Sequence, residues 1–147
     1  MLFKRISRSS AETIFIVVQN VSGSTITAGY SAVFDVGASV NGVRVTQGSA
    51  ADLGAYAGVA DADIANDAYG LVQAYGYRAT VYCKTVANSS TYSAGSGLDP
   101  VADVWSLTPS AVAAGDKQFA FLCEAITDSS DTSSAYSANF NGFIRAL

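Results

Sequence analysis

The stretch that most constrains the fold is AYGLVQAYGY, residues 68–77, because its side chains alternate between bulky and small. In an extended strand one face carries only small residues, Gly70, Val72, Ala74 and Gly76, and the other carries Tyr69, Leu71, Gln73, Tyr75 and Tyr77. A strand with one solvated face normally alternates apolar with polar residues. The stretch therefore predicts a core strand covered on both sides, by the chain's own sheet on one face and by a sister subunit on the other.

The bulky face supplies the candidate contact residues. Tyrosine is amphipathic and costs little entropy to order, so rows of it favour half-buried or interface positions. Gly70, Ala74 and Gly76 allow another sheet or backbone to approach closely on the opposite face. The alternative is a two-layer sandwich with an aromatic inner layer. The residues predicted to form an oligomer interface are Tyr69, Leu71, Tyr75 and Tyr77.

The rest of the chain is also predicted to be β-structure. Apolar or alternating runs that favour strands occupy residues 13–21, 30–37, 40–47, 57–64, 78–86, 101–109, 117–126 and 140–147, and one helical turn could begin at Ser49. Serine-rich loops are expected at 88–97 and 128–138. The sequence predicts an all-β fold: a small single-domain β-barrel or sandwich at 13–147, preceded by an extended N-terminal arm at 1–12.

Three segments share one plan: TITAGYSAVF, DIANDAYGLVQAYG and AVAAGDKQFAFLC. Each places a β-branched residue and one or two small residues before a turn, and a long apolar run after it. Gly29, the pair Asn66-Asp67 and Gly115 are residue types that tolerate positive φ or cap turns. We expect a tight turn to begin the strand that follows, although β-proteins in general share such features.

The composition limits the possible functions. Only 14% of the residues are charged and the net charge is −4, which disfavours nucleic-acid binding and suggests a surface either rich in small polar residues or covered by partners. The chain has no histidine, the commonest general base and metal ligand. IFIVV is too short for a signal core or a membrane span, so folding in a cytoplasm is expected. Cys83 and Cys123 are predicted to be buried free thiols rather than a disulfide.

No catalytic constellation emerges. Asp61, Asp63 and Asp67 form the best carboxylate cluster, for which a solvated turn is the favoured interpretation and a cation site the alternative. No GxSxG motif, phosphate-binding loop or metal-ligand spacing occurs, and neither cysteine has a histidine partner. The sequence predicts a non-enzymatic protein with no cofactor and no metal.

The N-terminal segment MLFKRISRSS concentrates basic charge on a chain that has little of it. One interpretation is a frayed, solvated terminus. The other is an arm that lies across an acidic partner surface. In that case Leu2 and Phe3 would supply apolar contacts, and the ion-pairing groups would be Lys4, Arg5 and Arg8.

Three stretches of turn-and-strand sequence are characteristic: NVSGSTITAGYSAVFD, AGVADADIANDAYGLVQAYGY and the final AITDSSDTSSAYSANFNGFIRAL. Through them, most of the chain after residue 18 resembles the head decoration, or capsid cement, proteins of tailed bacteriophages. It implies a β-rich domain, commonly trimeric, on the outer capsid lattice and without enzymatic activity.

From this resemblance we expect a virion protein that is assembled in the host cytoplasm and bridges neighbouring major capsid subunits on the outer surface of the head, without contacting nucleic acid or membrane. The alternatives are a tail or fibre accessory, a minor capsid subunit, a bacterial surface or fimbrial subunit, and an unexpected enzyme.

Overall fold

The computed structural model describes residues 12–37, 41–85, 91–109, 118–127 and 137–146. These residues form eleven strands and one turn of 3-10 helix, η1 (Leu53–Ala55), which confirms the all-β prediction. The strands are β1 (Ile14–Asn20), β2 (Ser31–Phe34), β3 (Arg44–Thr46), β4 (Tyr56–Ala60), β5 (Tyr69–Lys84), β6 (Thr91–Tyr92), β7 (Gly97–Pro100), β8 (Leu107–Pro109), β9 (Ala120–Leu122), β10 (Ile126–Thr127) and β11 (Ser137–Arg145). None of the described segments is a helix long and apolar enough to cross a lipid bilayer.

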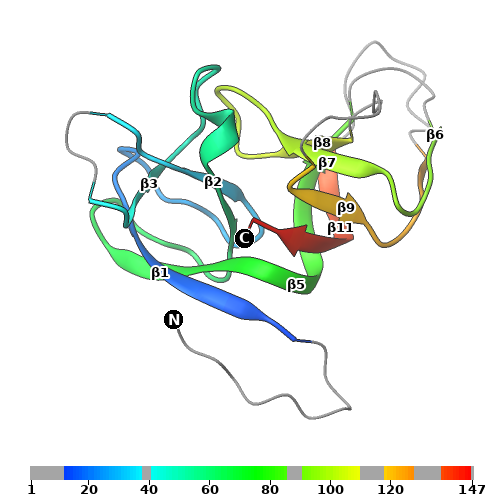
Figure 1. Ribbon diagram of the computed structural model, residues 1–147, viewed down its shortest axis with the longest axis horizontal. Helices are drawn as coiled ribbons and strands as arrows, with labels where there is room; N and C mark the ends of the chain where they lie inside the picture. Colours follow the sequence, from blue (N-terminus) through cyan, green and yellow to red (C-terminus); the bar gives the residue numbers. More distant parts are fainter. Residues whose placement is uncertain (1–11, 38–40, 86–90, 110–117, 128–136, 147) are drawn as a thin grey trace.

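Nine of the strands belong to one sheet that closes on itself twice (Figure 1). The first closure, ring 1, follows the order β1-β3-β2-β4-β5 and returns to β1. The second closure, ring 2, follows the order β5-β8-β7-β9-β11 and returns to β5. Strand β5 belongs to both rings, so the predicted barrel is a pair of small closed rings joined through one strand.

The two rings have the same topology. Each contains five strands, and when these are numbered in chain order within a ring, both rings read 1-3-2-4-5. In each ring the first and third strands pair in parallel, as β1 with β3 and as β5 with β8. The other pairings in both rings are antiparallel. The chain thus builds the same strand arrangement twice and uses β5 as the last strand of one ring and the first strand of the other.

Strand β5 is 16 residues long and unites two stretches that were predicted as separate strands. It bends at Gly76, whose φ is +106°. A Cβ built at this position would lie 2.2 Å from the carbonyl oxygen of Glu12. Gly76 therefore provides both the left-handed backbone conformation and the space in which the chain entering β1 crosses β5.

Each ring has its own apolar core. The ring 1 cluster consists of Val18, Ile26, Ala32, Val45, Ala57, Ala60, Ile64 and Val72. The ring 2 cluster consists of Val81, Cys83, Leu98, Leu107, Ala120, Leu122, Ile126 and Ile144, together with Tyr56 and Val59 from β4. Because β4 contributes to both clusters, the rings pack together along β4 as well as sharing β5.

Two of the three repeated segments form the expected turns. Ile26 and Ile64 pair in an isolated antiparallel bridge, with N–H···O distances of 2.9 and 2.8 Å. Three residues after each isoleucine the backbone adopts positive φ, +87° at Gly29 and +62° at Asp67. These turns stand directly before β2 and β5, which confirms the prediction for both segments. The third turn, at Gly115, lies outside the described residues.

Two predictions are corrected by the structure. Residues 88–97 are not a continuous loop, because Thr91 and Tyr92, both favourable strand residues, form β6 and pair with β10. Cys123 is exposed rather than buried, since β9 ends at Leu122 and the chain bends outward there. Cys83 is buried and free. Most of the second serine-rich segment, residues 128–136, lies outside the described residues, and β11 begins at Ser137.

Candidate interaction surface

An exposed apolar patch covers the outward face of β1 and β5. Its members are Val17, Tyr69 and Leu71, whose exposed fractions are 59%, 65% and 44%, and we call them the β1–β5 patch. Val17 lies directly opposite Leu71 in the antiparallel pairing, and Tyr69 lies opposite Gln19. Paired residues of a sheet project to the same face. The patch is therefore continuous across the two strands.

The local sequence explains why the bulky face of β5 points outward. Val72 and Ala74 are fully buried in the molecule. A Cβ added at Gly70 would lie 2.5 Å from the side chain of Ile64. The interior of ring 1 has room only for the small face of the strand, so the bulky side chains are placed on the outside.

A second group of aromatic side chains lies around the bend of β5. Tyr75 meets Phe143 of β11 edge to face, with ring centroids 5.1 Å apart, and Phe143 stacks on Phe121 of β9 at the same distance. The guanidinium of Arg145 lies 5.8 Å from the Phe121 ring centroid. Tyr77 is paired with Phe143 and is 43% exposed. We call Tyr75, Tyr77, Phe121 and Phe143 the aromatic strip.

The structure thus separates the four residues predicted to form an interface. Tyr69, Leu71 and Tyr77 are exposed large side chains, whereas Tyr75 is half-buried and packs within the molecule. Gln73, which shares their alternation, is buried instead. Its position opposite Val59 of β4 places it where the two rings meet.

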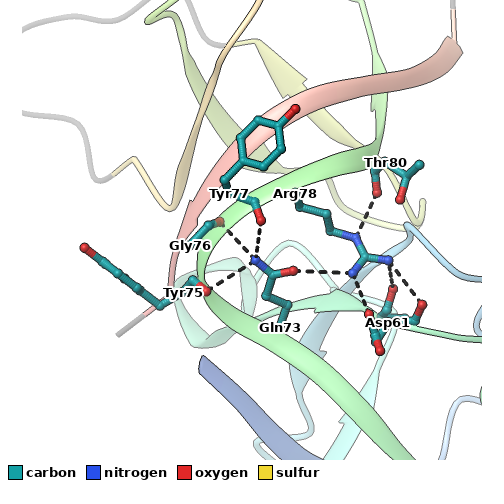
Figure 2. A network of polar contacts seen from close by, with 8 residues as sticks. Asp61, Gln73, Tyr75, Gly76, Tyr77, Arg78 and Thr80 are labelled. Carbon is teal, nitrogen blue, oxygen red and sulfur yellow. Dashed lines mark hydrogen bonds and ion pairs between the residues drawn. The ribbon is translucent and has the colours of Figure 1, made fainter. Parts of the chain in front are cut away.

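Gln73 holds the bend of β5 in place (Figure 2). Its Nε2 donates to the carbonyl oxygens of Gly76 and Tyr77, each at 3.0 Å, and more weakly to that of Tyr75 at 3.3 Å. β11 pairs with β5 through Gly76, whereas the pairing of β1 with β5 ends at Tyr75. The amide side chain therefore supplies a hydrogen-bond donor to the carbonyl groups at and beside the bend.

Arg78 completes the network from the other side, with its side chain only 8% exposed (Figure 2). Nη2 donates to the carbonyl oxygen of Ala60 at 2.8 Å, and Nε donates to that of Thr80 at 3.0 Å. Nη1 forms an ion pair with Asp61 Oδ1 at 3.0 Å. The buried charge is satisfied by carbonyls of both rings and one carboxylate, which fixes β5 against the end of β4.

The carboxylates of the candidate cluster have separate structural partners. Asp61 pairs with Arg78, Asp63 Oδ1 accepts the N–H of Ala28 at 2.8 Å, and Asp67 Oδ2 accepts a hydrogen bond from Asn66 Nδ2 at 2.8 Å. Over the described part of the chain, no three metal-ligating side chains come together. This geometry supports the turn interpretation of the cluster.

Neither thiol lies in an environment that lowers its pKa. Burial raises the pKa of Cys83 to about 12, and partial burial together with the neighbouring Glu124 raises the pKa of Cys123. A raised pKa keeps each thiol protonated near neutral pH, and the thiolate is the reactive form. Neither environment favours a nucleophilic cysteine.

The predicted arm contacts, Leu2, Phe3, Lys4, Arg5 and Arg8, lie outside the described residues. The described chain begins at Glu12, whose carbonyl oxygen lies beside Gly76. The described chain therefore enters β1 beside the bend of β5.

Sequence reasoning missed Val17 as a surface residue, because IFIVV is apolar throughout and indicates burial of both faces. It also missed Phe121 and Phe143, whose alignment depends on the pairing of β9 with β11.

A scan against protein-family models and a search of curated protein sequences found no match to this chain.

Proposed function

We propose that this chain is a non-enzymatic virion structural protein that decorates the outer surface of a bacteriophage head and bridges neighbouring major capsid subunits as a homo-oligomer. The observation that carries the proposal is the β1–β5 patch, in which Val17, Tyr69 and Leu71 stand exposed and adjacent on one sheet face. Contiguous apolar side chains on a rigid surface are typical of sites of protein–protein contact.

The scaffold supports this use of the patch. Gln73 and Arg78 hold the bend of β5 from within, so the residues on its outer face are fixed before a partner binds. Preorganisation reduces the entropy lost on association. The resemblance of the sequence to capsid cement proteins identifies the capsid lattice as the proposed partner.

A cement protein ties capsomers together against the pressure of packaged DNA. Individual contacts can be weak when several protomers of one oligomer bind the lattice simultaneously, because the second and later contacts are intramolecular. In this proposal the chain's low charge reflects surface that the oligomer and the shell cover. The segment 1–10 would add an electrostatic contact through Lys4, Arg5 and Arg8.

The test is to purify particles that contain this chain on a density gradient, release their DNA, and quantify the chain in the shell band. We expect it to remain with empty heads at a copy number comparable to that of the major capsid protein. Sedimentation with tails, or a few copies per particle, would refute decoration and favour a tail accessory role.

A paired substitution tests the patch itself. Leu71→Asp should reduce occupancy on expanded empty heads by at least about tenfold, because it places a charge in the centre of the apolar contact. The control is Val36→Asp, since Val36 is 48% exposed but lies after β2, outside the patch. Equal occupancy of the two variants would contradict the assignment of the β1–β5 patch as the capsid contact.

A further inference from the structure

We propose that the outer edge of β1 pairs with the same edge of a second copy of this chain, in an antiparallel arrangement about a twofold axis at Ile16. The inference specifies twofold pairing for the homo-oligomer of the proposed function, in place of the trimer that the resemblance implies, and it rests on that oligomer but not on the capsid partner. It concerns the edge of the strand, which is distinct from the face that carries the β1–β5 patch.

The outer edge of β1 is only partly paired among the described residues. β3 pairs with β1 at Gln19 and Asn20, whereas β5 pairs with β1 on the opposite edge from Ile14 to Gln19. On the outer edge Gln19 donates its N–H to the Val43 carbonyl oxygen at 2.7 Å. Because successive residues of a strand alternate in direction, the N–H and C=O groups of Val17 and Phe15 point to this same edge.

The pairing with β3 ends there for a local reason. The next bond of the parallel ladder would join the Val43 N–H to the Val17 carbonyl. Instead the Val43 N–H is donated to Asn41 Oδ1 at 3.1 Å. The asparagine side chain therefore terminates the ladder and leaves the peptide groups of Phe15 and Val17 available to another strand.

This edge has none of the usual protection against pairing. Proteins commonly guard free strand edges with lysine, proline or inward-pointing charges. β1 reads IFIVVQN and contains neither a charged residue nor a proline. Val17 is also its most exposed apolar side chain. The strand thus has the properties of an edge that is covered by a partner strand.

A second copy of β1 fits this edge better than a charged peptide would. Twofold pairing brings together two neutral strands, so no like charges are placed side by side and no charge is left unpaired. A twofold contact is also self-complementary, because each donor on one strand meets the matching acceptor on the other.

Counting the free peptide groups selects the register. If the axis passes through Ile16, Val17 lies opposite Phe15 of the second copy, and the two symmetry-related pairs exchange four main-chain hydrogen bonds. An axis at Val17 gives only two, because Gln19 is already bonded to Val43. An axis at Phe15 would require Thr13, which precedes β1.

Two substitutions of Val17 distinguish hydrogen bonding at the edge of β1 from side-chain contacts on the face of the sheet. Val17→Pro removes the N–H from the edge, and Val17→Thr retains it with a β-branched side chain. In sedimentation velocity over a concentration series, the wild type should form dimers or even-numbered multiples. Val17→Pro should weaken self-association at least about tenfold and Val17→Thr much less. Circular dichroism of both variants checks that the fold is retained.

Engineered cysteines test the register in a Cys123→Ser background. With the axis at Ile16, Ile16 of one copy lies opposite Ile16 of the second copy in a non-hydrogen-bonded pair. The Cα atoms of such a pair are about 4.5 Å apart, which is within disulfide range. Ile16→Cys should therefore form an intermolecular disulfide on mild oxidation. Val17→Cys should not, because its two copies are about 7–8 Å apart on the diagonal. Crosslinking of Val17→Cys instead would overturn the register.

The oligomeric state and the binding to empty heads also test the two proposals separately. A wild-type monomer at all concentrations, or a trimer that Val17→Pro leaves intact, would overturn the β1 pairing. Such a trimer would leave the oligomer of the proposed function standing. A dimer lost in Val17→Pro, from a protein that fails to bind empty heads, would support the pairing and refute capsid decoration.

Discussion

Arg78 is the residue whose replacement should most directly show how the two rings are held together. In Arg78→Met the aliphatic part of the side chain is kept but the guanidinium group is lost. The carbonyl oxygen of Thr80 then loses this donor at a part-buried position, whereas that of Ala60 loses one of two donors and keeps the N–H of Gly29 at 2.9 Å. Asp61 loses its ion-pair partner, but its side chain is 45% exposed and can be hydrated.

The expected loss in the free energy of unfolding can be estimated from these hydrogen-bond partners. Leaving the Thr80 carbonyl without this donor costs roughly 1–2 kcal/mol, and losing the second donor of the Ala60 carbonyl costs about 1 kcal/mol. The exposed end of the ion pair contributes less than about 1 kcal/mol. We therefore expect Arg78→Met to lower the free energy of unfolding by about 2–3 kcal/mol, and Asp61→Asn to lower it by less than about 1 kcal/mol.

Urea unfolding monitored by Trp105 fluorescence and far-ultraviolet circular dichroism measures both variants. The m-value should stay constant if the change acts on the native state alone. For a chain of this size the melting temperature of Arg78→Met should fall by about 8 °C. A loss below about 1 kcal/mol, or an equal loss in Asp61→Asn, would refute the reasoning that buried carbonyl satisfaction dominates.

Two further predictions concern the backbone and the buried thiol. Gly76→Ala should destabilise the fold by more than about 2 kcal/mol, because φ is +106° and the new Cβ would meet the Glu12 carbonyl; Gly54→Ala, with open space around it, is the control in urea unfolding. Cys83 has a pKa raised to about 12, so its contribution to stability is complete below its unfolded-state pKa near 9 and is lost as the pH rises towards 12. The urea midpoint should fall over this window, and Cys83→Ala should reduce the fall more than Cys123→Ser, because Cys83 is buried and Cys123 is exposed; an unchanged pH dependence in Cys83→Ala would contradict the assignment.

The alternation over residues 68–77 was sufficient to predict the two faces of β5, because a period of two follows from strand geometry alone. The turns before β2 and β5 were equally accessible, since Gly29 and the Asn66-Asp67 pair are residue types that accept positive φ. In these places local sequence determines local conformation.

Long-range pairing could not be predicted in the same way. Gln73 has the alternation of an outward residue, yet it is buried because β4 lies beside it and β5 bends three residues later. Val17 belongs to a wholly apolar run, and its exposure depends on where ring 1 closes. β6 could not be predicted within a serine-rich stretch because β10, its partner among the described strands, lies more than thirty residues further along the chain.

The shared strand also imposes an order on folding during synthesis. All the strand segments of ring 1 lie between Ile14 and Tyr75, so this ring can close while the rest of the chain is still being translated. Ring 2 cannot close until β11, the last strand, has emerged. We therefore expect the second half of β5 to extend beyond a completed ring 1 until β8 and then β11, the two later strands that pair with it directly, are added.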